Sequence, residues 1–259
     1  MQTIPFEIKL KEKGIKMPQF LIKKSNIQDG MISISNKQDI IHITKVLRKK
    51  IGDDIDFAGD DGMSYQAQIT TIQKNLLQAK ISTKTQNPHR INTNITLFQA
   101  IIKSSAQDIT IQKATELGTF EICPITTQFC VVNLKDKKDQ TQKLEKWQKI
   151  ALESCKQCKR ATPPIIDRIL SLKEALSLEY ELKIACVEKN ATATLKQILN
   201  SSEKKQNIAI FIGPEGGWSE DEMELFDKYN IQKASIGNMI LRAETASISA
   251  IAGVVYELG

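Results

Sequence analysis

The 259-residue sequence has no run of about 18 apolar residues and no apolar signal core near its start, so we expect neither membrane insertion nor secretion. Its two histidines, His42 and His89, both precede residue 91. The five cysteines are odd in number, and the single C-x-x-C at Cys155 and Cys158 has neither a second pair nor a nearby histidine. We therefore expect reduced thiols, a cytoplasmic protein and no metal site.

Positive charge is concentrated in two places. Residues 1–90 hold 15 Lys and Arg against 9 Asp and Glu, whereas residues 91–259 hold 21 of each, so the net charge of +6 lies in the first third. A second surplus, nine basic against four acidic residues, lies between Lys135 and Arg160. Two basic regions favour a nucleic-acid partner over a merely solvated surface.

The first third is predicted to be a small β-rich domain, residues 17–84. Short strands are indicated by "QFLIK", "MISIS", "DIDFA", "SYQAQITTI" and "LLQAKIS", with a hairpin turn at Asp60–Gly62. One helical interval, 38–49, ends in a basic cluster. The polar segment 85–94 is predicted to be a linker, and residues 1–16, before "MPQF", to be a dispensable extension.

Residues 95–259 are predicted to form an α/β domain. Apolar strands "ITLFQAII", "TFEICPI", "LKIACV", "NIAIFI" and "KASIG" alternate with helices near 105–117, 141–159, 191–200, 219–229 and 243–258. Continuous apolar strands between helices indicate a parallel sheet covered on both faces. Ligands of such sheets bind beyond the carboxyl ends of the strands, which points to the loops 188–191, 213–218 and 237–242.

The loop in "FIGPEGGWSEDE", Phe211–Glu222, leaves a buried strand at Pro214 and enters a helix through a capping box of Ser219 and Glu222. A helix N-terminus after glycines often binds phosphate. Here Glu220, Asp221 and Glu222 fill the first turn, and G-x-x-G-G matches neither the dinucleotide fingerprint nor the P-loop. A polyphosphate ligand is therefore disfavoured, and a tight connection without ligand is the alternative.

The loop before the last helix, "IGNMILRAETA", places Arg242 and Glu244 at the start of that helix. A local ion pair is the ordinary interpretation of an isolated R-x-E. Small residues recur along the same helix at a spacing of three to four, which permits close approach of another helix or sheet. They are Ala243, Ala246, Ala250 and Gly253. We expect a dimer contact on this face.

These motifs, with "QKATELG", "WQKIALESCKQCKR" and "IHITKVLR", resemble the RsmE family of bacterial 16S rRNA uridine N3 methyltransferases over residues 17–259. The resemblance implies an S-adenosylmethionine-dependent SPOUT domain with a trefoil knot, a PUA-like N-terminal barrel and a homodimer. The substrate is expected to be 16S rRNA within the 30S subunit. Met239 and Ala106 depart from the family, whose members commonly carry basic residues there.

The resemblance also assigns roles to residues. Arg242 is expected to stabilise the uracil anion, with Glu244 either as the base or as the group that orients Arg242. Cofactor-binding residues are expected to be Ile212, Gly213, Glu215, Gly216, Gly217, Ile236, Gly237, Ile240 and Leu241. RNA-binding residues are expected to be Arg48, Lys49, Lys103, Gln157 and Arg160.

Two alternatives remain open from the residues. A nicotinamide dehydrogenase on the same strand–helix pattern lacks the glycine fingerprint. A catalytically silent RNA-binding or ribosome-assembly factor would keep the fold and the cofactor site but show no turnover.

Overall fold

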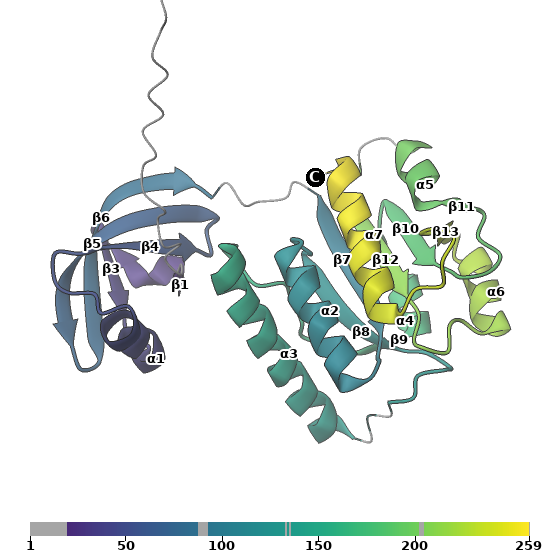
Figure 1. The fold of residues 1–259 in the computed structure, drawn as a ribbon, viewed down its shortest axis with the longest axis horizontal. Helices are drawn as coiled ribbons and strands as arrows, with labels where there is room; N and C mark the ends of the chain where they lie inside the picture. The colour runs from purple at the N-terminus through teal and green to yellow at the C-terminus, as the bar shows by residue number, and fades with distance from the viewer. Residues whose placement is uncertain (1–19, 88–92, 133, 135, 202–204, 259) are drawn as a thin grey trace, which may run out of the picture.

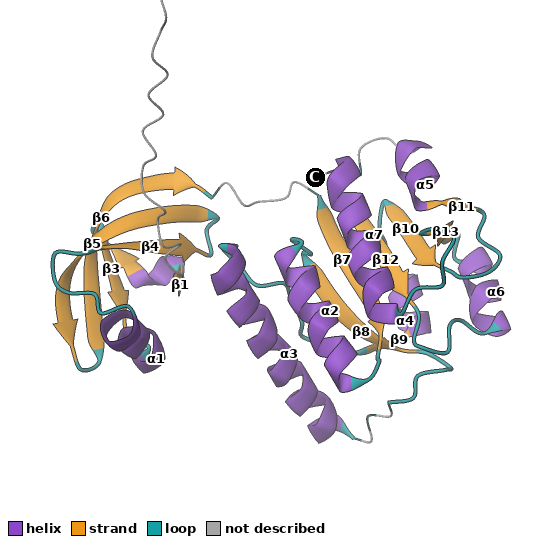
Figure 2. Cartoon of the chain, viewed as in Figure 1, coloured by secondary structure: helices purple, strands orange, loops and turns teal. Residues whose placement is uncertain are grey.

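The computed structural model describes residues 20–87, 93–132, 134, 136–201 and 205–258, which form two sheets connected in sequence through residues 87–93 (Figure 1). The predicted extension 1–16 lies outside the described residues, as does most of the predicted linker 85–94. Figure 2 colours helices purple and strands orange. It shows that the N-terminal part consists mainly of strands, whereas the larger part contains both helices and strands.

The N-terminal sheet has six strands in the order β1-β4-β5-β6-β3-β2. Their bounds are β1 Phe20–Ile22, β2 Ile27–Gln28, β3 Met31–Ile34, β4 Asp54–Gly59, β5 Met63–Gln73 and β6 Leu76–Gln86. All five strands predicted here are present. The predicted hairpin turn joins β4 to β5, where Gly62 has a φ of +76° that only glycine adopts readily. Alternate side chains of these strands, Phe57 and Ile32 among them, form a separate apolar core.

The predicted helix 38–49 is shorter and less regular than its sequence pattern indicates. It consists of α1, Lys37–Ile41, capped by the Asn36 side chain, followed by a π-helical turn at His42–Val46. Arg48 then adopts a left-handed φ of +53°. The basic residues Arg48 and Lys49 therefore follow the helix instead of forming its last turn.

The second sheet has seven strands in the order β11-β13-β10-β12-β7-β8-β9, and every pair within it is parallel, as predicted. Their bounds are β7 Asn94–Ala100, β8 Glu121–Thr126, β9 Leu170–Ser171, β10 Leu182–Cys186, β11 Ala193–Thr194, β12 Asn207–Ile212 and β13 Gln232–Ser235. The five predicted strands are present. The two-residue strands β9 and β11 at the edges were not predicted.

Helices cover both faces of this sheet, as its apolar strands require. The helices α2 Ser104–Glu116, α3 Lys137–Cys158, α5 Leu195–Ser201 and α7 Ala243–Leu258 contribute to one core cluster. The helices α4 Leu172–Ser177 and α6 Glu220–Lys228 contribute to the cluster on the other face. In Figure 1, α2, α3 and α7 lie side by side in front of the strands. All five predicted helices exist, and the short α4 is an addition.

Part of the small-residue stripe of α7, on which a dimer contact is expected, is buried within the single chain. Ala250 is fully buried within the single chain, and a Cβ on Gly253 would lie 3.1 Å from Cδ2 of Leu195 on α5. Ala246 also packs against the core. Ala243 and Ala250 are therefore packed inside the subunit and unavailable to a partner, whereas Ala246 and Gly253 are only partly buried.

Among the described residues, an ion pair and a hydrogen bond join the N-terminal sheet region to the larger part. The Lys156 ammonium on α3 lies 3.7 Å from the Asp39 carboxylate on α1. The Asn87 side-chain amide donates to the carbonyl of Lys159, which follows α3. The C-terminal end of α3 therefore lies against the N-terminal region, which brings the two basic regions of the sequence close to each other.

Within the described ranges no helix is long and apolar enough to cross a membrane, and no group of three or more potential metal ligands is found.

Candidate functional site

A cleft of about 1320 Å³ opens where the carboxyl ends of β7, β10, β12 and β13 meet. These four strands are neighbours in the sheet, so the loops that follow them are brought together although they are far apart in sequence. The nine residues predicted to bind a cofactor all line it: Ile212, Gly213, Glu215, Gly216, Gly217, Ile236, Gly237, Ile240 and Leu241. Arg242 and Glu244 line it as well.

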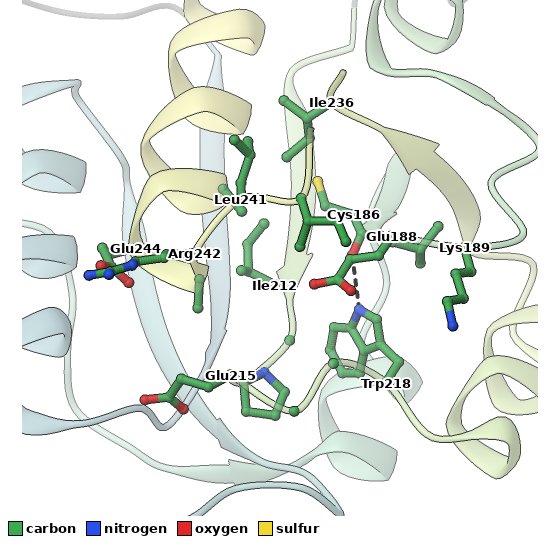
Figure 3. A pocket seen from close by; sticks show the side chains of 18 of the residues that line it. Cys186, Glu188, Lys189, Ile212, Glu215, Trp218, Ile236, Leu241, Arg242 and Glu244 are labelled. Carbon is green, nitrogen blue, oxygen red and sulfur yellow. Dashed lines mark hydrogen bonds between the residues drawn. The ribbon is translucent and has the colours of Figure 1, made fainter. Parts of the chain in front are cut away.

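The first glycine of the loop makes room for an aromatic ring. A Cβ on Gly213 would lie 3.1 Å from the Trp218 indole, which is tighter than an ordinary van der Waals contact. The indole Nε1 donates to the carbonyl of Cys186 at 2.9 Å, and the ring meets Phe226 edge to face. Trp218 thereby ties the glycine loop after β12 to the end of β10 (Figure 3).

The second glycine lies beneath the loop that follows β8. A Cβ on Gly216 would lie only 2.8 Å from the Cβ of Phe129. That loop is fixed by the buried carboxylate of Glu222, which accepts from the backbone N–H of Gln128 at 2.8 Å. The same carboxylate completes the predicted capping box with Ser219 at the start of α6. Glu222 therefore holds two loops together and is turned away from a ligand.

Acidic side chains outnumber basic ones in the cleft. Its lining includes the carboxylates of Glu188, Glu215, Glu220, Glu224, Asp227 and Glu244, six in all, against four cations, Lys103, Lys189, Lys233 and Arg242. Lys233 is already paired with Asp227 at 2.6 Å. An acid-rich cleft attracts a cationic ligand and repels a polyphosphate. The charges thus fit a sulfonium compound.

The floor of the cleft is apolar. Ile212 at the end of β12, and Ile236 and Leu241 in the loop between β13 and α7, point into it next to the side chain of Cys186 (Figure 3). Burial raises the pKa of the Cys186 thiol to about 12, so it stays neutral and contributes to the apolar wall. Such a surface suits the flat face of an adenine ring.

Arg242 and Glu244 project to the same side of the cleft from the first turn of α7 (Figure 3). Arg242 is exposed and Glu244 half-buried. Among the described residues no ion pair within 4.0 Å joins Arg242 to Glu244 or to any other carboxylate. The local ion pair that the sequence allows is not formed, so the guanidinium is available to a ligand.

The family is identified by sequence comparison. Residues 89–255 match a model described as an RNA methyltransferase domain, and residues 35–82 match an RNA methyltransferase PUA domain. The ribosomal RNA small subunit methyltransferase E of Rickettsia conorii is 32% identical over 242 residues, which cover 93% of this chain and 96% of that protein. This chain belongs to the ribosomal RNA small subunit methyltransferase E family. The enzyme of the same name from Bacillus subtilis is 26% identical, covering 91% of this chain and 94% of its own.

Solved structures agree with this family, and they confirm the predicted SPOUT fold with its PUA-like N-terminal domain. The ribosomal RNA small subunit methyltransferase E of Neisseria gonorrhoeae, a structure bound to S-adenosyl methionine, matches with a TM-score of 0.78 and 28% identity. The match covers 92% of this chain and 96% of that one. A putative methyltransferase from Legionella pneumophila, in complex with the same cofactor, matches with a TM-score of 0.78, 26% identity and coverage of 92% and 97%.

The predicted RNA-binding residues of this methyltransferase E family member fall into separate places. Lys103 lines the cleft, and its backbone N–H donates to Glu215 at 3.1 Å. Arg48, Lys49 and Gln157 lie outside the cleft. Arg48 and Gln157 are exposed, and Lys49 is half-buried.

Arg160 differs from the other predicted RNA contacts. Its guanidinium donates to the carbonyl of Thr115 in the last turn of α2, at 3.4 Å, and to the carbonyl of Thr119 just beyond that helix, at 2.6 Å. Burial lowers the pKa of this guanidinium from its ordinary value. Arg160 therefore satisfies backbone carbonyls inside the protein, which leaves less of it for RNA than the sequence suggests.

Sequence reasoning missed two parts of the site. The start of α2 contributes Ser105 and Ile109 to the cleft, beside Ala106. Phe129 covers the glycine loop from the segment after β8. Neither carries a local motif, because each reaches the site only through the order of strands in the sheet.

Proposed function

We propose that this protein transfers a methyl group from S-adenosylmethionine to N3 of a uridine in 16S rRNA of the small ribosomal subunit. Family membership and the cofactor named in two similar structures support the reaction class. The observation that carries the proposal is the guanidinium of Arg242 at the edge of an acid-rich cleft, paired with no carboxylate of the described residues. An enzyme of this kind acts in the cytoplasm, where ribosomes are assembled.

The cofactor is proposed to lie over the glycine loop. Gly217 leaves backbone groups open to close approach, because no atom lies within 4 Å of its Cβ position, and it has the left-handed φ of +73° that the turn requires. Gly213 and Gly216 let Trp218 and Phe129 pack against the loop. Ile236 and Leu241 would pack on the adenine. When bound, S-adenosylmethionine supplies an electrophilic methyl group on a sulfonium centre.

The chain's own residues must make uracil N3 nucleophilic. That nitrogen carries a proton, and its lone pair becomes reactive only when the proton leaves and negative charge develops on the ring. Arg242 presents two donors in one plane, which matches a developing oxyanion beside N3. Glu244 lies on the same side and is not paired with Arg242, so we propose it as the residue that accepts the proton.

RNA is proposed to contact the N-terminal domain and the nearby end of α3. Residues 17–84 hold ten Lys and Arg against seven Asp and Glu, a net charge of +3, and the Asp39–Lys156 ion pair places α1 against α3. We propose that residues 85–94 join this domain to the methyltransferase domain at 95–259. Arg48, Lys49, Gln157 and Lys103 are the proposed contacts.

We also propose a homodimer, although not through the buried stripe residues Ala243 and Ala250 of α7. Three apolar side chains at the rim of the cleft are exposed in the single chain: Ile109 at 45%, Met239 at 79% and Ile240 at 79%. Covering them with a second copy would remove apolar surface from water. It would also close the open side of the cleft.

The test measures binding and turnover separately. We expect S-adenosylmethionine to bind in calorimetry, and methyl groups to be transferred to small-subunit rRNA, free or within 30S particles. Binding of the cofactor without transfer to either substrate would favour the catalytically silent assembly factor. No binding at all would refute the proposed cofactor.

A further inference from the structure

Two polar side chains, one on the sheet and one on the helix above it, are fully buried beneath the cleft. Gln99 on β7 and Ser247 on α7 both have no solvent exposure. The Ser247 hydroxyl is within hydrogen-bond distance of Oε1 of Gln99 and of the Ala243 carbonyl, the latter at 2.9 Å. The Gln99 amide nitrogen donates to the carbonyl of Ala100 at 2.9 Å. Both ends of the buried amide are therefore satisfied, as a stable core requires.

The position of this pair relates it to the cleft. Gln99 is the last residue but one of β7, and in the sheet it lies beside Ile212, the residue that precedes the glycine loop. Ser247 lies one turn inside α7, which begins immediately after Arg242. The hydrogen bond thus connects the strand next to the glycine loop with the helix turn that carries Arg242 and Glu244.

The start of α7 needs such an anchor. An arginine side chain has donors only, so Arg242 cannot accept from the free N–H groups of the first turn, as Ser219 does for α6. The preceding residues Met239 and Ile240 are largely exposed and give the turn little packing. Ser247 is the hydroxyl that reaches from this turn to the sheet.

We propose that Gln99 and Ser247 are positioning residues for Arg242. Their bond sets the depth and rotation of the first turn of α7, so that the guanidinium faces the bound nucleotide. This inference rests on the proposed methyltransferase function. A displacement of about 1 Å at a catalytic group is enough to slow a reaction about 100-fold, so removal of the anchor would be visible in the rate.

Ser247→Ala tests the anchor, with Ser154→Ala as a matched control. Ser154 on α3 is also buried, and its hydroxyl also donates to the carbonyl four residues earlier, at 2.8 Å, but it bonds to no other element in the part of the chain that the structure describes. We expect Ser247→Ala to lower kcat for methyl transfer about 10- to 100-fold, with KM for RNA and the cofactor Kd within twofold of wild type. Ser154→Ala should keep the wild-type kcat. Equal rates for the two variants would overturn the proposal.

A double variant separates positioning from stability. Gln99→Met with Ser247→Ala replaces both polar partners by apolar groups, which removes the unsatisfied amide and should restore the melting temperature. We expect the rate to stay low. Recovery of the rate together with the melting temperature would show that the pair is merely structural.

Hydrogen exchange gives a readout that does not depend on activity. The N–H of Ala246 donates to the Arg242 carbonyl at 2.8 Å and reports on the first turn. We expect its exchange to accelerate at least tenfold in Ser247→Ala and in the double variant, but not in Ser154→Ala. Failure of the wild-type protein to methylate rRNA would refute the proposed function. Unchanged exchange at Ala246 in Ser247→Ala would independently refute the positioning role of Gln99 and Ser247.

Discussion

Gly216→Ala tests whether the glycine loop is held in a binding geometry by its neighbours. The added Cβ would lie 2.8 Å from Cβ, 3.4 Å from Cγ and 3.6 Å from the carbonyl oxygen of Phe129. Because a Cβ moves only with its backbone, rotation of the phenyl ring does not relieve the closest approach. The backbone of this loop is itself fixed by the Gln128–Glu222 hydrogen bond at 2.8 Å. The clash must therefore displace one of the two loops.

Overpacking of this kind costs about 1 to 3 kcal/mol. If the loop relaxes in the free protein and must return to bind, that cost appears as a Kd for S-adenosylmethionine raised about 5- to 150-fold. Titration calorimetry measures it, with thermal unfolding alongside. The double variant Gly216→Ala with Phe129→Gly is the control, because it removes the Phe129 Cβ at 2.8 Å and Cγ at 3.4 Å and leaves the carbonyl oxygen at 3.6 Å, an ordinary contact. Wild-type affinity in Gly216→Ala, or no recovery of affinity in the double variant, would refute the reasoning.

Three further predictions concern charged residues. Arg242→Ala should lower the single-turnover methylation rate about 10²- to 10³-fold with little change in cofactor affinity, and Arg242→Lys should recover only part of that rate. A wild-type rate in Arg242→Ala would show that Arg242 is not a catalytic residue. Glu244→Gln should lower the single-turnover rate with little change in cofactor affinity, because an amide cannot accept the N3 proton, and a wild-type rate would assign the proton to another group. Replacing Arg48 and Lys49 with Ala should weaken RNA binding. It should also reduce the slope of log affinity against log salt concentration by about 0.9 for each duplex phosphate that the protein no longer neutralises. An unchanged salt dependence would show that the RNA binds elsewhere.

The fold was predictable because its longer strands show one of two sequence patterns. In one pattern apolar and polar residues alternate, and in the other the residues are continuously apolar. Strands β10 and β12 are buried on both faces, and their sequences "LKIACV" and "NIAIFI" indicate this directly. The two-residue strands β9 and β11 are too short to show a period. The π-helical turn at His42–Val46 was not predictable from the sequence either. A change from α-helical to π-helical hydrogen bonds leaves the apolar face of a short helix almost unaltered.

The site was predictable where a loop follows a parallel strand and carries its own motif. Gly213 and Arg242 are both found this way, and both line the cleft. Interactions that depend on the packing of distant elements were not predictable. Phe129 meets Gly216 only because two loops cross, and Arg160 binds carbonyls near the end of α2 instead of lying free. The small residues of α7 fit an internal contact as well as a dimer, and sequence spacing does not distinguish the two.

The most direct test of the central claim is mass spectrometry of the nucleosides of 16S rRNA from a strain that lacks this protein. We predict the loss of one N3-methyluridine, restored by the wild-type protein and not by Arg242→Ala. A complete set of N3-methyluridines in the deletion strain would contradict the proposed reaction, and restoration of the missing nucleoside by Arg242→Ala would contradict the proposed catalytic residue.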